Sequence, residues 1–237
     1  MTDILNPPAL ISTRRGPRDW ISPLDVSRST LTRATLLLCA GAAPVSAIAV
    51  HVVGWMSMRD SAVFVVAPLA LIALVLVARR SFEARWALRG AAAGLLAVMA
   101  YDAVRMPLVW LRIWPDFIPR IGGWVTGEHG TNVLIGYAWR YLGDGTGIGL
   151  AYFAFCAVVL QIRPNLVRVH PIALSVAYGI FVWTGLVATV VVPPHGEALL
   201  FRLTAASFGL SLLGHLVYGG VLGLCLSRYL TRDVVSV

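Results

Sequence analysis

Six apolar segments of membrane-spanning length constrain this chain more than any other feature of its sequence. They cover approximately residues 36–56, 62–78, 88–110, 145–162, 172–192 and 204–226. A helix needs roughly 17 to 25 mainly apolar residues to cross a bilayer, and each segment is close to that length. The mean hydropathy of +0.79 and the hydrophobic share of 58% also lie outside the range of soluble domains. We therefore predict an all-α, polytopic membrane helical bundle with about six transmembrane helices.

Arginines mark the ends of these segments, and all nineteen basic residues are arginine. Loops rich in basic residues stay on the cytoplasmic side of a bacterial inner membrane. With a cytoplasmic N-terminus, the inner side receives thirteen of the nineteen, namely Arg14, Arg15, Arg18, Arg28, Arg33, Arg79, Arg80, Arg85, Arg89, Arg163, Arg168, Arg228 and Arg232. We therefore predict a multi-pass protein of the bacterial inner membrane, with both termini cytoplasmic and anionic lipid headgroups as counterions.

The absence of lysine excludes several mechanisms. Retinal and pyridoxal Schiff bases need an amine, and a Walker A nucleotide site needs a lysine. The formal net charge of +8 does not indicate nucleic-acid binding, because the arginines are not interleaved with aromatic residues on one polar face. Cys39, Cys156 and Cys225 are isolated in apolar segments and are expected to be small core residues. We expect neither nucleic acid nor nucleotide as a partner.

Polar segments flank and interrupt the predicted transmembrane domain of residues 34–228. Residues 1–33 form an Arg/Pro-rich tail in which residues 22–25 could start a short interfacial helix, and residues 229–237 form a second short tail. The first tail is longer than the charged region of a secretory signal, so the first helix is predicted to be an uncleaved anchor.

The longest connection covers residues 111–144 and is predicted to face outward. It is rich in tryptophan, tyrosine, proline and glycine, and aromatic rings of this kind belong at the headgroup level. We expect residues 131–142 to form an amphipathic helix lying in the interface, and the glycine-rich part before them to form a cap over the bundle. A helical N-cap explains Asp144 at the start of the fourth segment.

Three pairs of glycines four residues apart predict close helix crossings. They are Gly90 and Gly94, Gly145 and Gly149, and Gly219 and Gly223. Two glycines at this spacing share one helical face and allow two backbones to touch in lipid.

Charged residues inside the third apolar segment are costly at that depth. Asp102 and Arg105 are three residues apart on one helical face and are expected to pair, either for packing or to hold the carboxylate ionised for a proton or a ligand. Tyr101 is adjacent, and His215 in the last segment lies at a similar depth. We therefore predict an intramembrane polar site of Asp102, Arg105, Tyr101 and His215, in which Asp102 and His215 meet, or in which His215 only bonds a neighbouring carbonyl.

Two outer histidines each lie beside a glutamate. Imidazole and carboxylate groups are ligands for transition metals, so these pairs predict a metal site if the outer loops bring them together. They are Glu128 with His129, and His195 with Glu197. The alternative is that all four are ordinary solvated loop residues. His51 and His170 have no charged neighbour and are left out of the site.

The last segment carries a family resemblance. His215-Leu-Val-Tyr218-Gly219-x-x-x-Gly223 resembles the His-x-x-Tyr-Gly-x-x-x-Gly helix of some small bacterial inner-membrane proteins, and Gly90-Ala-Ala-Ala-Gly94-Leu-Leu-Ala is similar to their glycine-rich opening helix. Those proteins have no agreed activity. The resemblance implies a related fold for about two of the six segments and no particular chemistry.

These features leave three functional hypotheses. The first in order of preference is an accessory subunit of a larger membrane complex, which could also hold a cofactor. The second is a membrane-embedded enzyme or proton-linked protein with a transition-metal site. The third is a small transporter, which needs a polar path on both sides of the membrane, and the cytoplasmic halves of the segments have few residues to line one.

Overall fold

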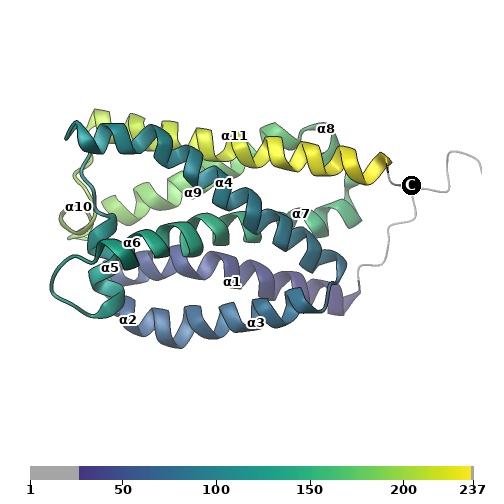
Figure 1. Cartoon of the computed structure of the whole chain (residues 1–237), viewed down its shortest axis with the longest axis horizontal. Coiled ribbons are helices and arrows are strands. Elements are labelled where there is room, and N and C mark those ends of the chain that lie inside the picture. The colour runs from purple at the N-terminus through teal and green to yellow at the C-terminus, as the bar shows by residue number, and fades with distance from the viewer. Residues whose placement is uncertain (1–26, 236–237) are drawn as a thin grey trace, which may run out of the picture.

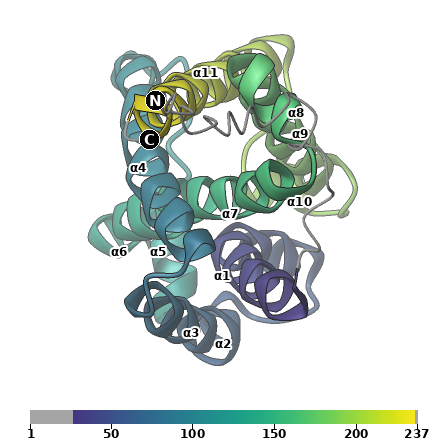
Figure 2. The same cartoon turned by 90° about the vertical axis from the view of Figure 1, so that its right-hand side faces the viewer.

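The computed structural model describes residues 27–235 of the chain, and all regular structure in this part is helical. This confirms the all-α class. Six helical segments are long and apolar enough to cross a membrane, as the sequence predicts: Arg28–Val53, Met58–Ala78, Phe82–Trp110, Val133–Ile162, Pro171–Val191 and Ala205–Thr231. They lie side by side in one bundle (Figures 1 and 2).

Two of the six spans are composite, because a π-helical segment joins two α-helices. The elements in chain order are α1 (Arg28–Val53), α2 (Met58–Ser61), the π-helix η1 (Ala62–Val66), α3 (Ala67–Ala78), α4 (Phe82–Trp110), α5 (Ile118–Thr126), α6 (Val133–Ala138), the π-helix η2 (Trp139–Gly145), α7 (Thr146–Ile162), α8 (Pro164–Val169), α9 (Pro171–Val191), α10 (Gly196–Leu199) and α11 (Ala205–Val235). The short helices α5, α8 and α10 lie in the connections between spans.

Helix α7 occupies the centre of the bundle and packs extensively against both α1 and α4 (Figure 2). Helices α9 and α11 form a closely packed pair, which joins the rest of the bundle mainly through α11 against α4. The span α2–α3 packs on α1 at the opposite side. Helix α1 begins and α11 ends at the same end of the bundle (Figure 1), as an even number of spans requires.

Glycines lie at the closest helix crossings. A Cβ atom on Gly149 of α7 would overlap the backbone of Gly90 and Gly94 on α4, and a Cβ on Gly94 would overlap Gly145. Two of the predicted glycine pairs therefore pack against each other. The third pair, Gly219 and Gly223 on α11, contacts the backbone of α9. Close backbone approach of this kind supplies van der Waals packing, which drives helix association in lipid.

Buried tyrosine hydroxyls connect the helices of the core. Tyr152 and Ser175 share a hydrogen bond of 2.8 Å between α7 and α9, and Tyr218 of α11 donates to the carbonyl of Gly145 at 2.7 Å. Because no water is available in the hydrocarbon region, a buried hydroxyl needs a partner within the protein. These bonds satisfy that requirement and fix α9 relative to α7 and α11 relative to η2.

The fourth span begins earlier than predicted. Asn132 is the N-cap, since its side chain accepts a hydrogen bond from the Ile135 amide at 3.1 Å. Helices α6, η2 and α7 then run without a break to Ile162. The predicted helix over residues 131–142 is thus present from Val133, but it is the first part of the fourth span and no separate interfacial helix. The expectation that Asp144 caps the helix is wrong, because Asp144 lies well inside the span. Glycines and charges in this segment lower its hydropathy and hide the start of the helix.

Helix α5 forms the predicted cap. It lies against α6. A Cβ on Gly122 of α5 would overlap the backbone of Asn132 and Gly136, and a Cβ on Gly136 of α6 would overlap the backbone of Ile118. The other end of the chain differs from the prediction in its boundary, because α1 already begins at Arg28, inside the predicted tail. The interfacial helix predicted at residues 22–25 lies outside the described residues.

The two ends of the bundle differ in charge. Within residues 27–231, the end where α1 begins carries nine arginines and one acidic residue, Glu83, which pairs with Arg33 at 3.3 Å. The opposite end carries six arginines and six acidic residues: Arg59, Arg105, Arg112, Arg120, Arg140 and Arg202 with Asp60, Asp102, Asp116, Asp144, Glu128 and Glu197. One end is thus strongly basic and the other is close to neutral.

Candidate functional site

A network of charged side chains lies inside the near-neutral half of the bundle. Helix α4 contributes Asp102 and Arg105, α6 contributes Tyr137, η2 contributes Arg140, and Asp116 belongs to the connection after α4. At about 1.5 Å per residue, Asp102 lies roughly 12 Å before the end of α4. The network therefore lies in the third of α4 nearest its C-terminal end. Asp102 and Arg105 are 2% and 3% exposed, so both charges are turned toward the protein interior, as the sequence predicts.

The strongest contact in the network joins Asp102 to Arg140. The Arg140 Nε donates to the two carboxylate oxygens of Asp102 at 2.9 and 2.8 Å, and its Nη2 donates to Oδ1 at 2.5 Å. The side chains are 3% and 13% exposed. The Arg140 guanidinium also lies 4.7 Å from the centre of the Tyr101 ring. This two-pronged geometry is the strongest form of arginine–carboxylate pairing.

Arg105 links this pair to the connection after α4. Its Nη1 lies 3.8 Å from Asp102, so the predicted pairing within α4 is present, but its shorter contact is from Nη2 to Asp116 at 2.5 Å. The Tyr137 hydroxyl donates to the other oxygen of Asp116 at 2.9 Å. Arg105 itself is fully enclosed, with 3% of its side chain exposed. Two arginines and two aspartates therefore neutralise one another.

Two polar atoms beside the network have no hydrogen-bond partner among the described residues. They are Oδ1 of Asp144 and the indole nitrogen of Trp139, and both are buried. The two residues lie at opposite ends of the π-helix η2, on either side of Arg140. π-helical turns are uncommon and often occur at functional sites. The Nε and Nη2 groups of Arg140 bond Asp102, so Asp144 interacts with this arginine through its charge and forms no ion pair of its own among the described residues.

His215 contacts a different residue of α4 from the one predicted. Its ring lies edge-on to Tyr101 with the centroids 5.4 Å apart, and its Nδ1 lies 2.8 Å from the Ser211 carbonyl. The Ser211 hydroxyl in turn accepts a hydrogen bond from Trp183 of α9 at 3.0 Å. Asp102 and His215 therefore do not meet as expected. The Tyr101 ring contacts both His215 and Arg140 instead. The carbonyl bond is the alternative that the sequence left open for this histidine.

The four predicted metal ligands do not form a site. His129, Glu128, His195 and Glu197 are all exposed, and the Glu197 carboxylate accepts a hydrogen bond from the Leu203 amide at 3.0 Å. Within residues 27–231, no three His, Cys, Asp or Glu side chains lie close enough to hold a metal ion. The structure therefore gives no support to a transition metal at the outer loops.

The sequence reasoning missed Arg140, Asp116 and Tyr137. All three lie in the connection of residues 111–144, for which the sequence predicts an outward-facing loop and an interfacial helix, where polar and aromatic residues need no partner. A signal was present, because Arg140 and Asp144 are four residues apart and precede the glycine pair that begins at Gly145. This four-residue spacing is typical of a helix that begins before Gly145. It places Arg140 on the same helical face as Asp144, next to the crossing with α4.

Tyr137→Phe tests the outer part of the network. The phenyl ring keeps its packing and loses the hydroxyl that donates to Asp116, so we expect the free energy of unfolding to fall by about 1 kcal/mol. The measurement is a titration of the purified protein from mild detergent into a denaturing one. Tyr229→Phe is the control, because the described structure gives its hydroxyl no hydrogen bond. Equal losses in the two variants would contradict this role of Tyr137.

Comparison with known proteins identifies no family for this chain. No protein-family model matches the chain, and neither a curated protein nor a solved structure matches it. The resemblance of the last helix to small bacterial inner-membrane proteins therefore stays a prediction. The evidence for a role comes from the bundle itself.

Proposed function

We propose that this chain is a non-catalytic integral component of the bacterial inner membrane, acting as an accessory subunit of a larger membrane complex. The observation that carries the proposal is that the buried charged side chains pair with one another. Asp102 with Arg140, and Asp116 with Arg105 and Tyr137, use their charges and hydrogen bonds on one another. A substrate site needs polar groups that remain available to a ligand. Paired charges of this kind instead fix how α4 and α6–η2–α7 lie together.

Faces of the bundle that lack internal partners support an assembly role. Only 17% of the apolar window is buried in each of the spans α2–α3 and α9. On α9 the exposed face carries Ala177, Gly185 and Ala188 together with Phe181, which is 71% exposed, and Gly185 has open space where a Cβ would lie. Small residues at exposed positions allow another transmembrane helix to approach closely. The face of α9 is accordingly our choice for the subunit contact.

The charge difference between the two ends supports the orientation. Nine arginines against Glu83 at the end where α1 begins match the basic loops that stay in the cytoplasm. Both termini are then cytoplasmic, and the charged network faces the outer half of the membrane. Anionic headgroups of the inner leaflet would balance the basic end.

Purification of the tagged full-length protein from its native membranes in mild detergent tests the subunit role. We expect a second membrane protein in stoichiometric amount, and we expect Gly185→Trp on α9 to release it while the chain itself remains folded. Leu74→Trp on the exposed face of α3 is the control and should retain the partner. Purification of the chain alone from native membranes would contradict the proposal.

A second candidate function is proton-linked, and the unpartnered atoms of Asp144 and Trp139 favour it. The Asp144 Oδ1 is buried and has no hydrogen-bond partner among the described residues, and a carboxyl group at this depth is a place to hold a proton. The test is a vesicle assay with an internal pH dye. The proton-linked hypothesis expects the protein to dissipate an imposed pH gradient and Asp144→Asn to abolish this. The subunit hypothesis expects no proton movement in either case.

A further inference from the structure

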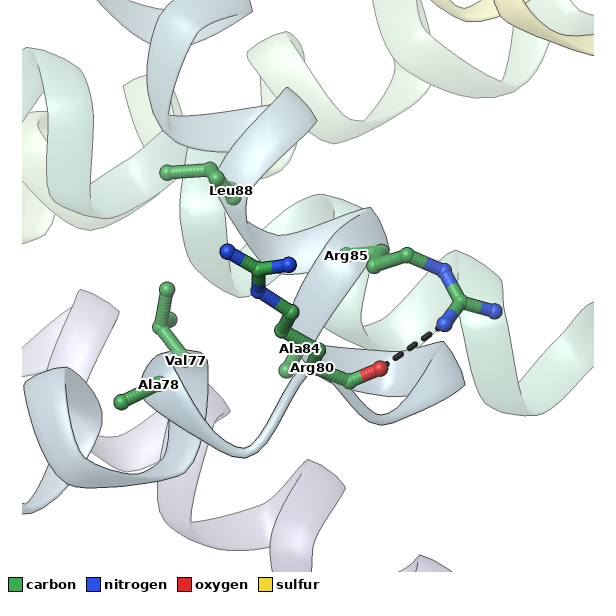
Figure 3. A pocket seen from close by; sticks show the side chains of 6 residues that line it. All are labelled: Val77, Ala78, Arg80, Ala84, Arg85 and Leu88. Carbon is green, nitrogen blue, oxygen red and sulfur yellow. Dashed lines mark hydrogen bonds between the residues drawn. The ribbon is translucent and has the colours of Figure 1, made fainter.

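The corner where α3 turns into α4 contains a hollow of about 490 Å³ at the basic end of the bundle (Figure 3). Val77 and Ala78 of α3 line one side, and Ala84 and Leu88 of α4 line the other. Arg80 and Arg85 complete the lining. The hollow is thus apolar along the helices and cationic at the turn, and it lies where a span meets the headgroup region.

Arg80 is held over this hollow by the backbone of the turn. Its φ of +52° is a left-handed conformation, which glycine usually adopts just after a helix end. The Arg85 guanidinium donates to the Arg80 carbonyl at 2.8 Å and thereby braces the turn. In Figure 3 the Arg80 guanidinium lies between Val77 and Leu88, whereas Arg85 is directed to the other side. A glycine here would relax the turn and remove the guanidinium that lies between Val77 and Leu88.

Among the described residues, no acidic side chain neutralises the positive charge at this corner. Arg79, Arg80 and Arg85 are exposed, and none of them pairs with an acidic side chain in the described part of the chain. The nearby Glu83 is buried and accepts a hydrogen bond from Arg33 at 3.3 Å. Three exposed guanidinium groups around one turn therefore form a favourable place for an anion, at the level of the lipid phosphates.

We propose that this corner binds one glycerophospholipid with an anionic headgroup. One acyl chain occupies the hollow against Val77 and Leu88, and the phosphate accepts hydrogen bonds from Arg80. Arg79 and Arg85 provide the preference for a net negative headgroup, because they repel the ammonium group of a zwitterionic lipid. The inference rests on the membrane location in the proposed function, but it needs no partner protein.

Native mass spectrometry of the purified full-length protein tests the site. Phosphatidylglycerol and phosphatidylcholine with identical acyl chains are added in turn, and retained lipid is counted. We expect one tightly retained phosphatidylglycerol, and about fivefold weaker binding in Arg80→Gln, since one arginine contact at a membrane surface is lost. Arg168→Gln removes the same charge from α8 at the same end of the bundle and should leave binding unchanged.

Two further results distinguish the source of the phosphate and the nature of the attraction. Leu88→Trp fills the hollow and keeps every arginine, so it should also weaken phosphatidylglycerol retention. Inorganic phosphate should not displace the lipid, and displacement would identify a free-anion site and overturn the proposal. Equal losses in Arg80→Gln and Arg168→Gln would overturn it too, because they would indicate general attraction by the basic end. None of these results depends on whether a partner subunit co-purifies.

Discussion

Asp102→Ala should destabilise the bundle by about 3 to 5 kcal/mol, the largest effect we expect from a single substitution. Removing one member of a buried ion pair leaves the other charge enclosed without compensation. Here Arg140 would lose all three of its hydrogen bonds to the carboxylate, and Arg105 would lose a second anion. The loss should therefore exceed the value for an ordinary buried hydrogen bond, which is about 1 kcal/mol.

The measurement is the midpoint of unfolding when purified protein is transferred from mild to denaturing detergent. Glu128→Ala removes an acidic side chain that is exposed in the connection between α5 and α6 and makes no described ion pair, so it serves as the control. It should stay within about 0.5 kcal/mol of the wild type. An Asp102→Ala protein as stable as this control would show that the carboxylate faces water or is not paired.

Gly149→Ala should have the second largest effect, a loss of about 1 to 3 kcal/mol or more. A single added methyl group would overlap the backbone of Gly90 and Gly94, and backbone atoms cannot move aside as a side chain can. Helices α4 and α7 would have to separate at the centre of the bundle. That separation would also move Arg140 away from Asp102, because η2 continues directly into α7.

Gly220→Ala is the matched control for the glycine crossing. Nothing lies within 4 Å of the position where its Cβ would be built, although Gly220 neighbours a glycine that does lie at a crossing. Alanine favours helix over glycine, so this variant should be neutral or slightly stabilised. The same unfolding assay compares the two variants, and similar losses in both would indicate that glycine matters for reasons other than helix contact.

Most of the fold could be predicted from the sequence, because the length of an apolar segment is a direct physical requirement of a span. The six spans and the glycine crossings follow from local patterns of this kind. The start of the fourth span could not be predicted in the same way. Between Val133 and Gly145 the helix is stabilised by its contacts with α4 and α5, and these contacts are not visible in a hydropathy profile.

The candidate site shows the same division between local and long-range information. The 3.8 Å approach of Arg105 to Asp102 follows from their spacing on one helix. The dominant partner, Arg140, lies 38 residues away and depends on how two spans pack. Similarly, the similar depth of Asp102 and His215 in their helices predicts that the two side chains meet. The contact also depends on which face of α4 is turned toward α11, and that face carries Tyr101.

The most direct test of the account is a double-mutant cycle on the charged pair, using Asp102→Asn, Arg140→Gln and the combined variant. If the two side chains face each other inside the bundle, the double variant should lose far less free energy of unfolding than the two single losses added together. A coupling of more than about 1 kcal/mol is the predicted result. Additive losses would contradict it, because they would mean that the two charges are solvated separately.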